Sequence, residues 1–131
     1  MTDSIFGEIV HSYPREQAIE DGELVDISTL AETREAGFRV PVAVTRSVWN
    51  LVEVPDELKG SQDLKGRLWD LCFMACLSFR SRKAQSDNIE ACRIVKFRVI
   101  FQMTEKLQEK PELWLVFNEH EGFTIMRPED Y

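Results

Sequence analysis

The apolar segment over residues 68–79, LWDLCFMACLSF, constrains the fold more than any other part of this 131-residue chain. Only Asp70 and Ser78 are polar in it. A helix that is apolar nearly all the way around is normally enclosed by other elements. We therefore predict a central buried helix over residues 66–83, whose basic C-terminal end complements the helix dipole.

Start and stop signals for helices divide the chain before this central helix. Pro14 is favoured in the first turn of a helix, and Gly22 can end that helix in the left-handed conformation. Ser28 or Thr29 can cap a further helix that Gly37 ends. We predict, in chain order, a helix over 15–21, a strand over 23–27, a helix over 30–36, an extended segment over 38–44 and, after a cap at Thr45, a helix over 46–54.

The part of the chain after the central helix has the pattern of β-structure. Apolar and polar residues alternate over 92–103, and a period of two is typical of a half-buried strand. Two more apolar segments, 113–117 and 123–127, flank a polar turn over 118–122. We predict a C-terminal antiparallel three-stranded meander, and hence one α+β domain over 1–131 with about three short helices besides the central one.

Charge is distributed unevenly along the chain. Residues 1–60 hold 12 acidic and 5 basic side chains, residues 61–104 hold 4 and 8, and the remainder holds 7 and 3, for a net charge of −7. Acidic outer segments disfavour direct binding to nucleic acid and suit contact with a basic protein surface. The alternative is that the acids only keep the protein in solution.

Apolar runs, cysteines and known motifs in the sequence indicate the compartment and the cofactors to expect. No apolar run approaches the roughly 18 residues of a membrane span, and the N-terminal residues have no basic leader. Three cysteines, an odd number, suggest reduced thiols. We therefore expect a cytoplasmic protein that does not bind membranes. Since no phosphate-binding loop, nucleophile elbow or zinc-protease motif occurs, we expect no cofactor, no metal and no catalytic residues.

The cysteines and His120 have two interpretations each. Cys72 and Cys76 share one face of the central helix, where they either pack as small apolar groups or bind a metal together with Cys92 or a histidine. We expect the packing role, because their neighbours are apolar. His120, between two glutamates, is expected in an exposed acidic turn rather than in a metal or acid–base site.

A basic set follows the central helix and continues on the strand after it. It either forms a phosphate-binding patch or is a solvated face that pairs with the acidic segments. The aromatic residues of the strand lie on its other face, which argues against stacking of bases. Its members are Arg80, Arg82, Lys83, Arg93, Lys96 and Arg98.

Four segments together resemble an uncharacterised family of short acidic proteins, encoded mostly on bacterial plasmids, phages and other mobile elements. They are YPREQAIEDGELVDIS, EAGFRVPVAVTRSVW, GRLWDLCFMA and FTIMRPED. The chain departs from the family pattern at Ile27, where the pattern has valine, and over 84–117. The resemblance implies an accessory gene of a mobile element, a class in which inhibitors of host defence are common. The pattern falls on Tyr13, Arg15, Gln17, Asp21, Gly22, Asp26, Gly37, Pro41, Thr45, Trp49, Gly66, Arg67, Trp69 and Asp70.

Three hypotheses for function follow. The first is a non-enzymatic protein of the anti-CRISPR or antirestriction type, which binds a host protein or ribonucleoprotein defence complex through acidic residues. The second is a small-ligand-binding protein or enzyme with a polar pocket, in which Arg67 and Asp70 anchor the ligand. The alternative for these two residues is a structural i,i+3 ion pair near the helix start. The third is a structural or regulatory subunit, for example of a homodimer, with Trp114 or Phe6 exposed in a patch. The acidic candidates are Glu16, Glu20, Asp21, Glu23, Glu32 and Glu35, and the pocket candidates are Tyr13, Arg15, Gln17, Arg67 and Asp70.

Overall fold

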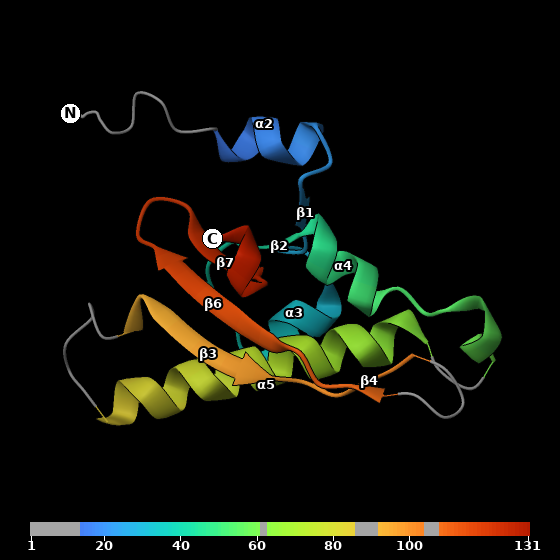
Figure 1. Ribbon diagram of the computed structural model, residues 1–131. Helices are drawn as coiled ribbons and strands as arrows, with labels where there is room; N and C mark the ends of the chain where they lie inside the picture. The colour runs from blue at the N-terminus through green and yellow to red at the C-terminus, as the bar shows by residue number, and fades with distance from the viewer. Residues whose placement is uncertain (1–13, 61–62, 86–91, 104–107) are drawn as a thin grey trace.

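The computed structural model describes residues 14–60, 63–85, 92–103 and 108–131. These residues confirm the α+β class, with four α-helices and a five-stranded mixed sheet (Figure 1). Within these ranges, no helix combines the length and the apolar character needed to cross a membrane. The elements are α2 (Arg15–Glu20), β1 (Leu24–Asp26), α3 (Ala31–Ala36), β2 (Val42–Thr45), α4 (Arg46–Val52), η1 (Asp56–Leu58), α5 (Leu64–Gln85), β3 (Ile94–Arg98), β4 (Phe101–Gln102), β5 (Gln108–Glu109), β6 (Glu112–Asn118), β7 (Gly122–Met126) and η3 (Pro128–Asp130).

The predicted stop and start residues fix the short helices, with one exception. Gly37 ends α3 at a φ of 116°, and the Thr45 hydroxyl accepts a hydrogen bond from the Val48 N–H at the start of α4. The predicted cap at Ser28 or Thr29 is wrong, because Leu30 is the N-cap of α3. The Ser28 hydroxyl instead accepts from the Val42 N–H at 2.9 Å and so ties the β1–α3 connection to β2.

The sheet joins both ends of the described chain. Its strand order is β1-β2-β7-β6-β3, and all neighbours are antiparallel except the parallel pair β2–β7. The predicted C-terminal meander is therefore not a separate unit, since its strands continue into a sheet that includes β1 and β2. The sequence shows the strands, but parallel pairing between segments about 80 residues apart has no local signal.

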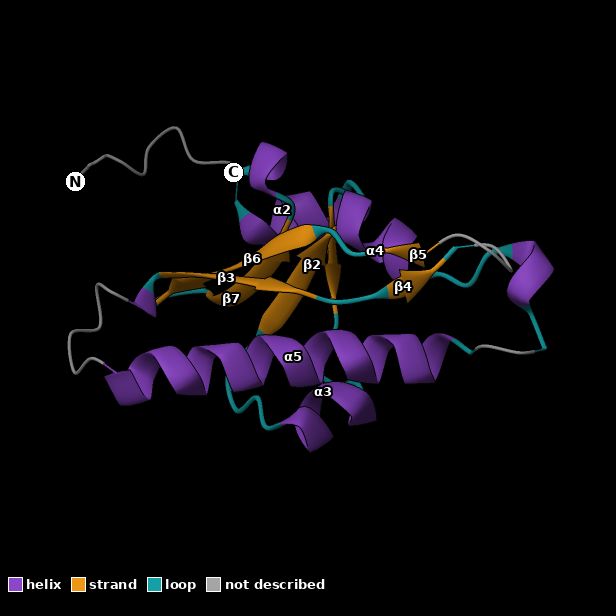
Figure 2. Cartoon of the chain, turned by 60° about the horizontal axis from the view of Figure 1, so that its bottom comes forward, coloured by secondary structure: helices purple, strands orange, loops and turns teal. Residues whose placement is uncertain are grey.

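The helices cover the two faces of the sheet unequally. Alternate residues of a strand point to opposite faces. One set, which includes Val44, Leu115 and Ile125, is buried in the core cluster with the inner face of α5. Figure 2 shows α5 along this side of the sheet, with α3 on the far side of α5 and α2 on the opposite side of the sheet.

The central helix α5 packs against both the sheet and α3 but is not covered all the way around, which corrects the prediction that other elements enclose it. Leu71, Cys72 and Ala75 are fully buried against the sheet and α3. Trp69, Phe73 and Leu77, which follow one another at intervals of four residues, are 36%, 39% and 45% exposed. These three residues are called the α5 outer stripe below. The sequence pattern did not distinguish the two faces, because both are apolar.

The long strand predicted over 92–103 is interrupted. It ends as β3 at Arg98, and the chain resumes as β4, which pairs with β5 in a separate two-stranded sheet. Val95, Phe97, Val99 and Phe101 are nevertheless all buried, as their shared parity predicts. The alternation therefore reports which side faces the core, and it does not report the break in strand pairing.

Candidate functional site

Arg15 of the predicted polar pocket is an anchor that fastens α2 to the sheet. Its Nη1 donates to the Thr124 hydroxyl at 2.8 Å, and its Nη2 donates to the Phe123 carbonyl at 2.7 Å. Burial lowers the pKa of Arg15, although the charges of Glu121 and Asp26 oppose this effect. Because Thr124 alternates with the core residues Phe123 and Ile125, Arg15 lies on the sheet face turned away from α5.

Arg67 of the same predicted pocket is a clamp on the other side of the sheet, and it is only 5% exposed. Its Nε donates to the Val52 carbonyl at 3.1 Å, and its Nη2 donates to the Leu51 carbonyl at 2.6 Å. These are the last two residues of α4, whose carbonyls lack partners within their own helix. Nη1 donates to the Gln102 carbonyl at 2.7 Å, so one side chain joins α4, α5 and β4.

The electrostatic surroundings of Arg67 agree with a structural role. Its guanidinium lies 5.2 Å from the centre of the Phe101 ring, a cation–π distance, and burial lowers its pKa. Asp70 is exposed, and no hydrogen bond or ion pair joins it to Arg67 in the described part of the chain. The Arg67 guanidinium is thus directed at main-chain carbonyls rather than at a ligand.

The remaining pocket candidates do not complete a site. Gln17 is exposed and donates from Nε2 to the Asp21 carboxylate at 3.0 Å within α2 and its C-terminal turn. Tyr13 lies outside the described residues. Since Arg15 and Arg67 lie on opposite sides of the sheet, the structure does not bring the predicted pocket residues together.

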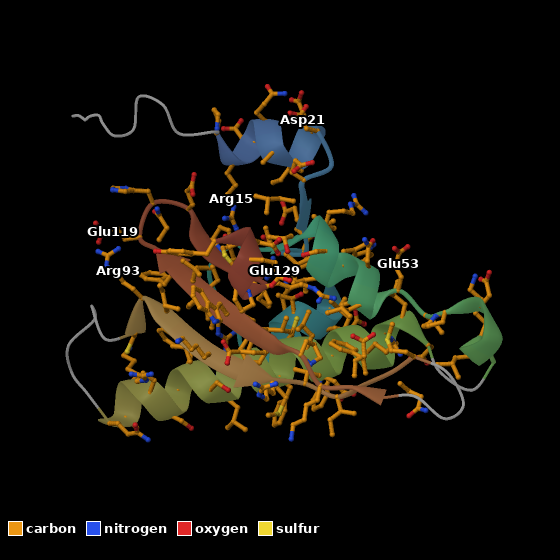
Figure 3. The ribbon with its side chains drawn as sticks, viewed as in Figure 1. Arg15, Asp21, Glu53, Arg93, Glu119 and Glu129 are labelled. Atoms are coloured by element: carbon orange, nitrogen blue, oxygen red, sulfur yellow. The ribbon has the colours of Figure 1, made fainter. Side chains whose placement is uncertain are left out.

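The acidic candidates separate into two groups. Figure 3 shows Arg15 reaching from α2 toward the sheet and Asp21 on the outer side of the helix. Glu32 and Glu35 lie on α3, which packs against α5 across the sheet from α2. The first group, called the α2 acidic surface below, is formed by Glu16, Glu20, Asp21 and Glu23, all of which are exposed.

The cysteines are structural in the described part of the chain. Cys72, Cys76 and Cys92 are free and buried. Burial raises the pKa of Cys72 to about 11, which leaves its thiol protonated and a poor metal ligand near neutral pH. No group of three His, Cys, Asp or Glu side chains that could hold a metal ion occurs among the described residues. His120 is exposed in the turn between β6 and β7, with Nε2 3.8 Å from the Glu119 carboxylate.

A polar depression of about 560 Å³ lies where β2 meets α4, and sequence reasoning did not identify it. Asp130 of η3 borders it, and its Oδ2 accepts hydrogen bonds from the Thr45 hydroxyl at 2.8 Å and the Ser47 hydroxyl at 2.6 Å. Burial by itself raises the pKa of Asp130, but these bonds and one from the Arg127 N–H outweigh it and hold the pKa below its usual value. Asp130 thus fastens η3 to the start of α4.

A second hollow, of about 420 Å³, lies between the C-terminal half of α5 and residues 37–40. Its walls also include Phe117 of β6 and Phe123 of β7, so four separate segments form it. From the predicted basic set, only Arg80 and Lys83 line this hollow. Lys96 instead lies over the Trp114 ring at 5.1 Å on the edge of the sheet, so the basic set does not form one patch.

The aromatic residues proposed for a homodimer patch are placed differently. Trp114 is half-buried, and the Tyr131 ring lies 5.4 Å from it, centre to centre. Phe6 lies outside the described residues. Among the described residues, Trp114 is therefore not one of the exposed large apolar side chains, whereas the three residues of the α5 outer stripe are. The signal of this stripe in the sequence is the interval of four residues between Trp69, Phe73 and Leu77.

Comparisons with known proteins give one match. The model of a family of unknown function, DUF6573, matches residues 5–113, which reach from the N-terminal segment into β6. No curated protein and no solved structure matches the chain. The matched span covers Arg15, Arg67 and the α2 acidic surface, whereas β7 and η3 follow it. Since the match includes most of the sequence, this chain belongs to the DUF6573 family.

Proposed function

We propose that this protein has no catalytic activity of its own and acts by binding a basic surface of a larger complex through the α2 acidic surface. The observation that carries the proposal is that three of these carboxylates, those of Glu16, Glu20 and Glu23, are exposed and uncompensated among the described residues. The side chains of Glu16, Glu20 and Glu23 form no ion pair with any other residue that the structure describes.

The arginines near these carboxylates are directed elsewhere. Arg15 donates to the sheet, as described above, and Arg46 Nε donates to the Gly22 carbonyl at 2.9 Å. Both bonds hold α2 and its following turn against the sheet. The acidic side chains are thus presented on a positioned element, which lowers the entropic cost of binding.

The proposed partner is a protein whose Lys- or Arg-lined channel normally holds nucleic acid, because uncompensated carboxylates are attracted to such a channel and increase the rate of association. The resemblance noted above favours host defence complexes, that is, CRISPR effectors and restriction enzymes. Inhibition would follow from occupation of the channel, and no reaction is required of the protein itself.

The test is to mix the full chain at micromolar concentration with purified CRISPR effectors and restriction enzymes, and to measure both complex formation and nuclease activity. A matched pair of charge reversals locates the surface. We expect Glu16→Lys with Glu20→Lys to abolish binding, and Glu32→Lys with Glu35→Lys to leave it unchanged, because the second pair lies across the sheet.

Salt provides a second measurement. Attraction between exposed charges weakens as ionic strength rises, so affinity is expected to fall between 50 and 300 mM salt, over which the screening length decreases to roughly 6 Å. If no complex binds or loses activity, or if both charge-reversal pairs bind as the unchanged protein does, the proposal is wrong.

A further inference from the structure

The hollow at the C-terminal half of α5 has an aromatic floor that is already assembled. The Phe79 and Phe123 rings meet edge to face with their centres 5.0 Å apart, and the Phe117 and Phe123 rings are also 5.0 Å apart. Phe79 comes from α5, whereas the other two come from neighbouring strands. Because regular elements of the core hold all three rings, the floor does not need to form when a ligand arrives.

The rim of this hollow is basic. Arg39, Arg80 and Lys83 line it and are exposed, and no acidic residue contributes to its walls. The side chains of the three form no hydrogen bond or ion pair with another described residue. Three uncompensated cations around one apolar depression are notable in a chain whose net charge is −7.

One of these cations lies against the main chain at the edge of the hollow. The Arg80 guanidinium lies against the main chain of Gly37, so closely that a Cβ at this position would collide with Nη2. Gly37 also has a φ of 116°, which disfavours other residues. The Arg80 guanidinium thus lies beside the glycine that ends α3, and both residues line the hollow.

We propose that this hollow binds a small amphipathic anion, with an aromatic body against the phenylalanines and a carboxylate, sulfonate or phosphate at the basic rim. Its volume of about 420 Å³ falls within the range of small-molecule pockets, roughly 300 to 1,000 Å³. Arginine and lysine together suit an anionic head group, and burial of the body supplies apolar free energy. The proposal is independent of the α2 acidic surface, which lies across the sheet.

The probe is 8-anilinonaphthalene-1-sulfonate, an aromatic anion whose fluorescence increases on binding. We expect saturable binding of one molecule to the folded chain. Arg80→Gln with Lys83→Gln is expected to weaken binding about tenfold or more, since the loss of charge-assisted hydrogen bonds corresponds to at least that factor. The control, Arg82→Gln with Lys110→Gln, removes the same charge away from the hollow and is expected to leave the affinity unchanged.

Filling the hollow gives a second, independent variant. Val40 lines it and is 42% exposed, so Val40→Trp can occupy the space without disturbing the core. We expect this variant to lose the probe, whereas Ile100→Trp, at an apolar position that is 54% exposed and outside the hollow, retains it. Thermal unfolding of each variant verifies that the protein is folded.

The uncharged analogue N-phenyl-1-naphthylamine tests the anionic part of the proposal, and its affinity is expected to be at least about tenfold lower. Equal affinity of the two compounds would overturn the anion preference. Equal binding to the Val40→Trp and Ile100→Trp variants would overturn the site itself, and it would indicate attachment elsewhere, such as the α5 outer stripe.

Discussion

The Trp69 ring lies parallel to the Phe73 ring on the outside of α5, with their centres 4.7 Å apart and their planes 9° apart. The stacked pair covers neighbouring turns of the helix and leaves more than a third of each side chain exposed. Helix α5 therefore contributes to the core through one face and presents an aromatic surface through the other.

This asymmetry predicts unequal effects of truncating apolar residues of the same helix. Leu71→Ala, at a fully buried position, is expected to lower the free energy of unfolding by about 2–5 kcal/mol. Phe73→Ala is expected to cost about 1 kcal/mol, because much of the ring is already in water. Urea unfolding at two protein concentrations measures both. If both variants lose the same free energy of unfolding, and if that loss changes with protein concentration, a second copy of the chain covers the α5 outer stripe in solution.

Replacement of the buried Arg67 is expected to destabilise the chain strongly. Arg67→Met leaves the carbonyls of Leu51, Val52 and Gln102 without this donor, and the expected loss is about 3 kcal/mol or more. Arg67→Lys retains the charge but not the planar fork, so an intermediate loss is expected. Arg82→Met, on the exposed last turn of α5, is the control and is expected to change stability by less than about 0.5 kcal/mol. Similar losses for Arg67→Met and Arg82→Met would contradict the clamp.

Substitution of Gly122 and Gly60 by alanine distinguishes the cost of backbone strain from the cost of a steric clash. Both have positive φ, at 94° and 107°, but a Cβ on Gly60 would meet no atom within 4 Å. Gly60→Ala is therefore expected to cost only the backbone strain, about 1–2 kcal/mol. A Cβ on Gly122 would collide with the Pro41 carbonyl, which accepts the Phe123 N–H at 2.9 Å. Gly122→Ala is expected to cost about 1–3 kcal/mol more. Thermal unfolding compares the two variants, and an equal loss would argue against close packing of β7 on the residue before β2.

The contribution of Asp130 to the free energy of unfolding depends on pH. Its folded-state pKa lies below the usual value near 3.8, so its contribution is present above that value and disappears as pH falls through the lower folded pKa. Asp130→Asn is expected to cost about 1–2 kcal/mol at pH 7, because the bonds from Thr45 and Ser47 then end on a neutral group. The difference between the two proteins should shrink as pH falls below about 4. Glu129→Gln, at the exposed neighbouring position, should show no such trend, and a difference that persists at low pH would refute this role of the carboxylate.

Local signals predicted much of the fold. The continuous apolar segment identifies α5, Gly37 and Thr45 mark helix ends, and alternation after Cys92 identifies the buried side of a strand. Each depends on residues within one or two turns of one another. The parallel pairing of Val44 beside Ile125 depends on the packing of distant segments, and no local pattern carries that information.

The same limit applies to the candidate sites. Arg67 shares a helix face with Leu71, so its burial could have been expected, and a buried guanidinium requires acceptors. Its acceptors, however, belong to α4 and β4. Arg15 and Thr124 are 109 residues apart in sequence. The aromatic hollow likewise depends on the meeting of segments whose phenylalanines are indistinguishable in sequence from ordinary core residues.

The position of β7 has a consequence for biosynthesis. It follows the other four strands of this sheet in sequence, yet it lies in the middle of the sheet, between β2 and β6. A nascent chain therefore cannot complete the sheet until residues 122–126 have left the ribosome, and until then two unfinished edges remain exposed to chaperones and proteases. A premature stop codon just before residue 122 would divide the sheet at its centre rather than shorten it at one side.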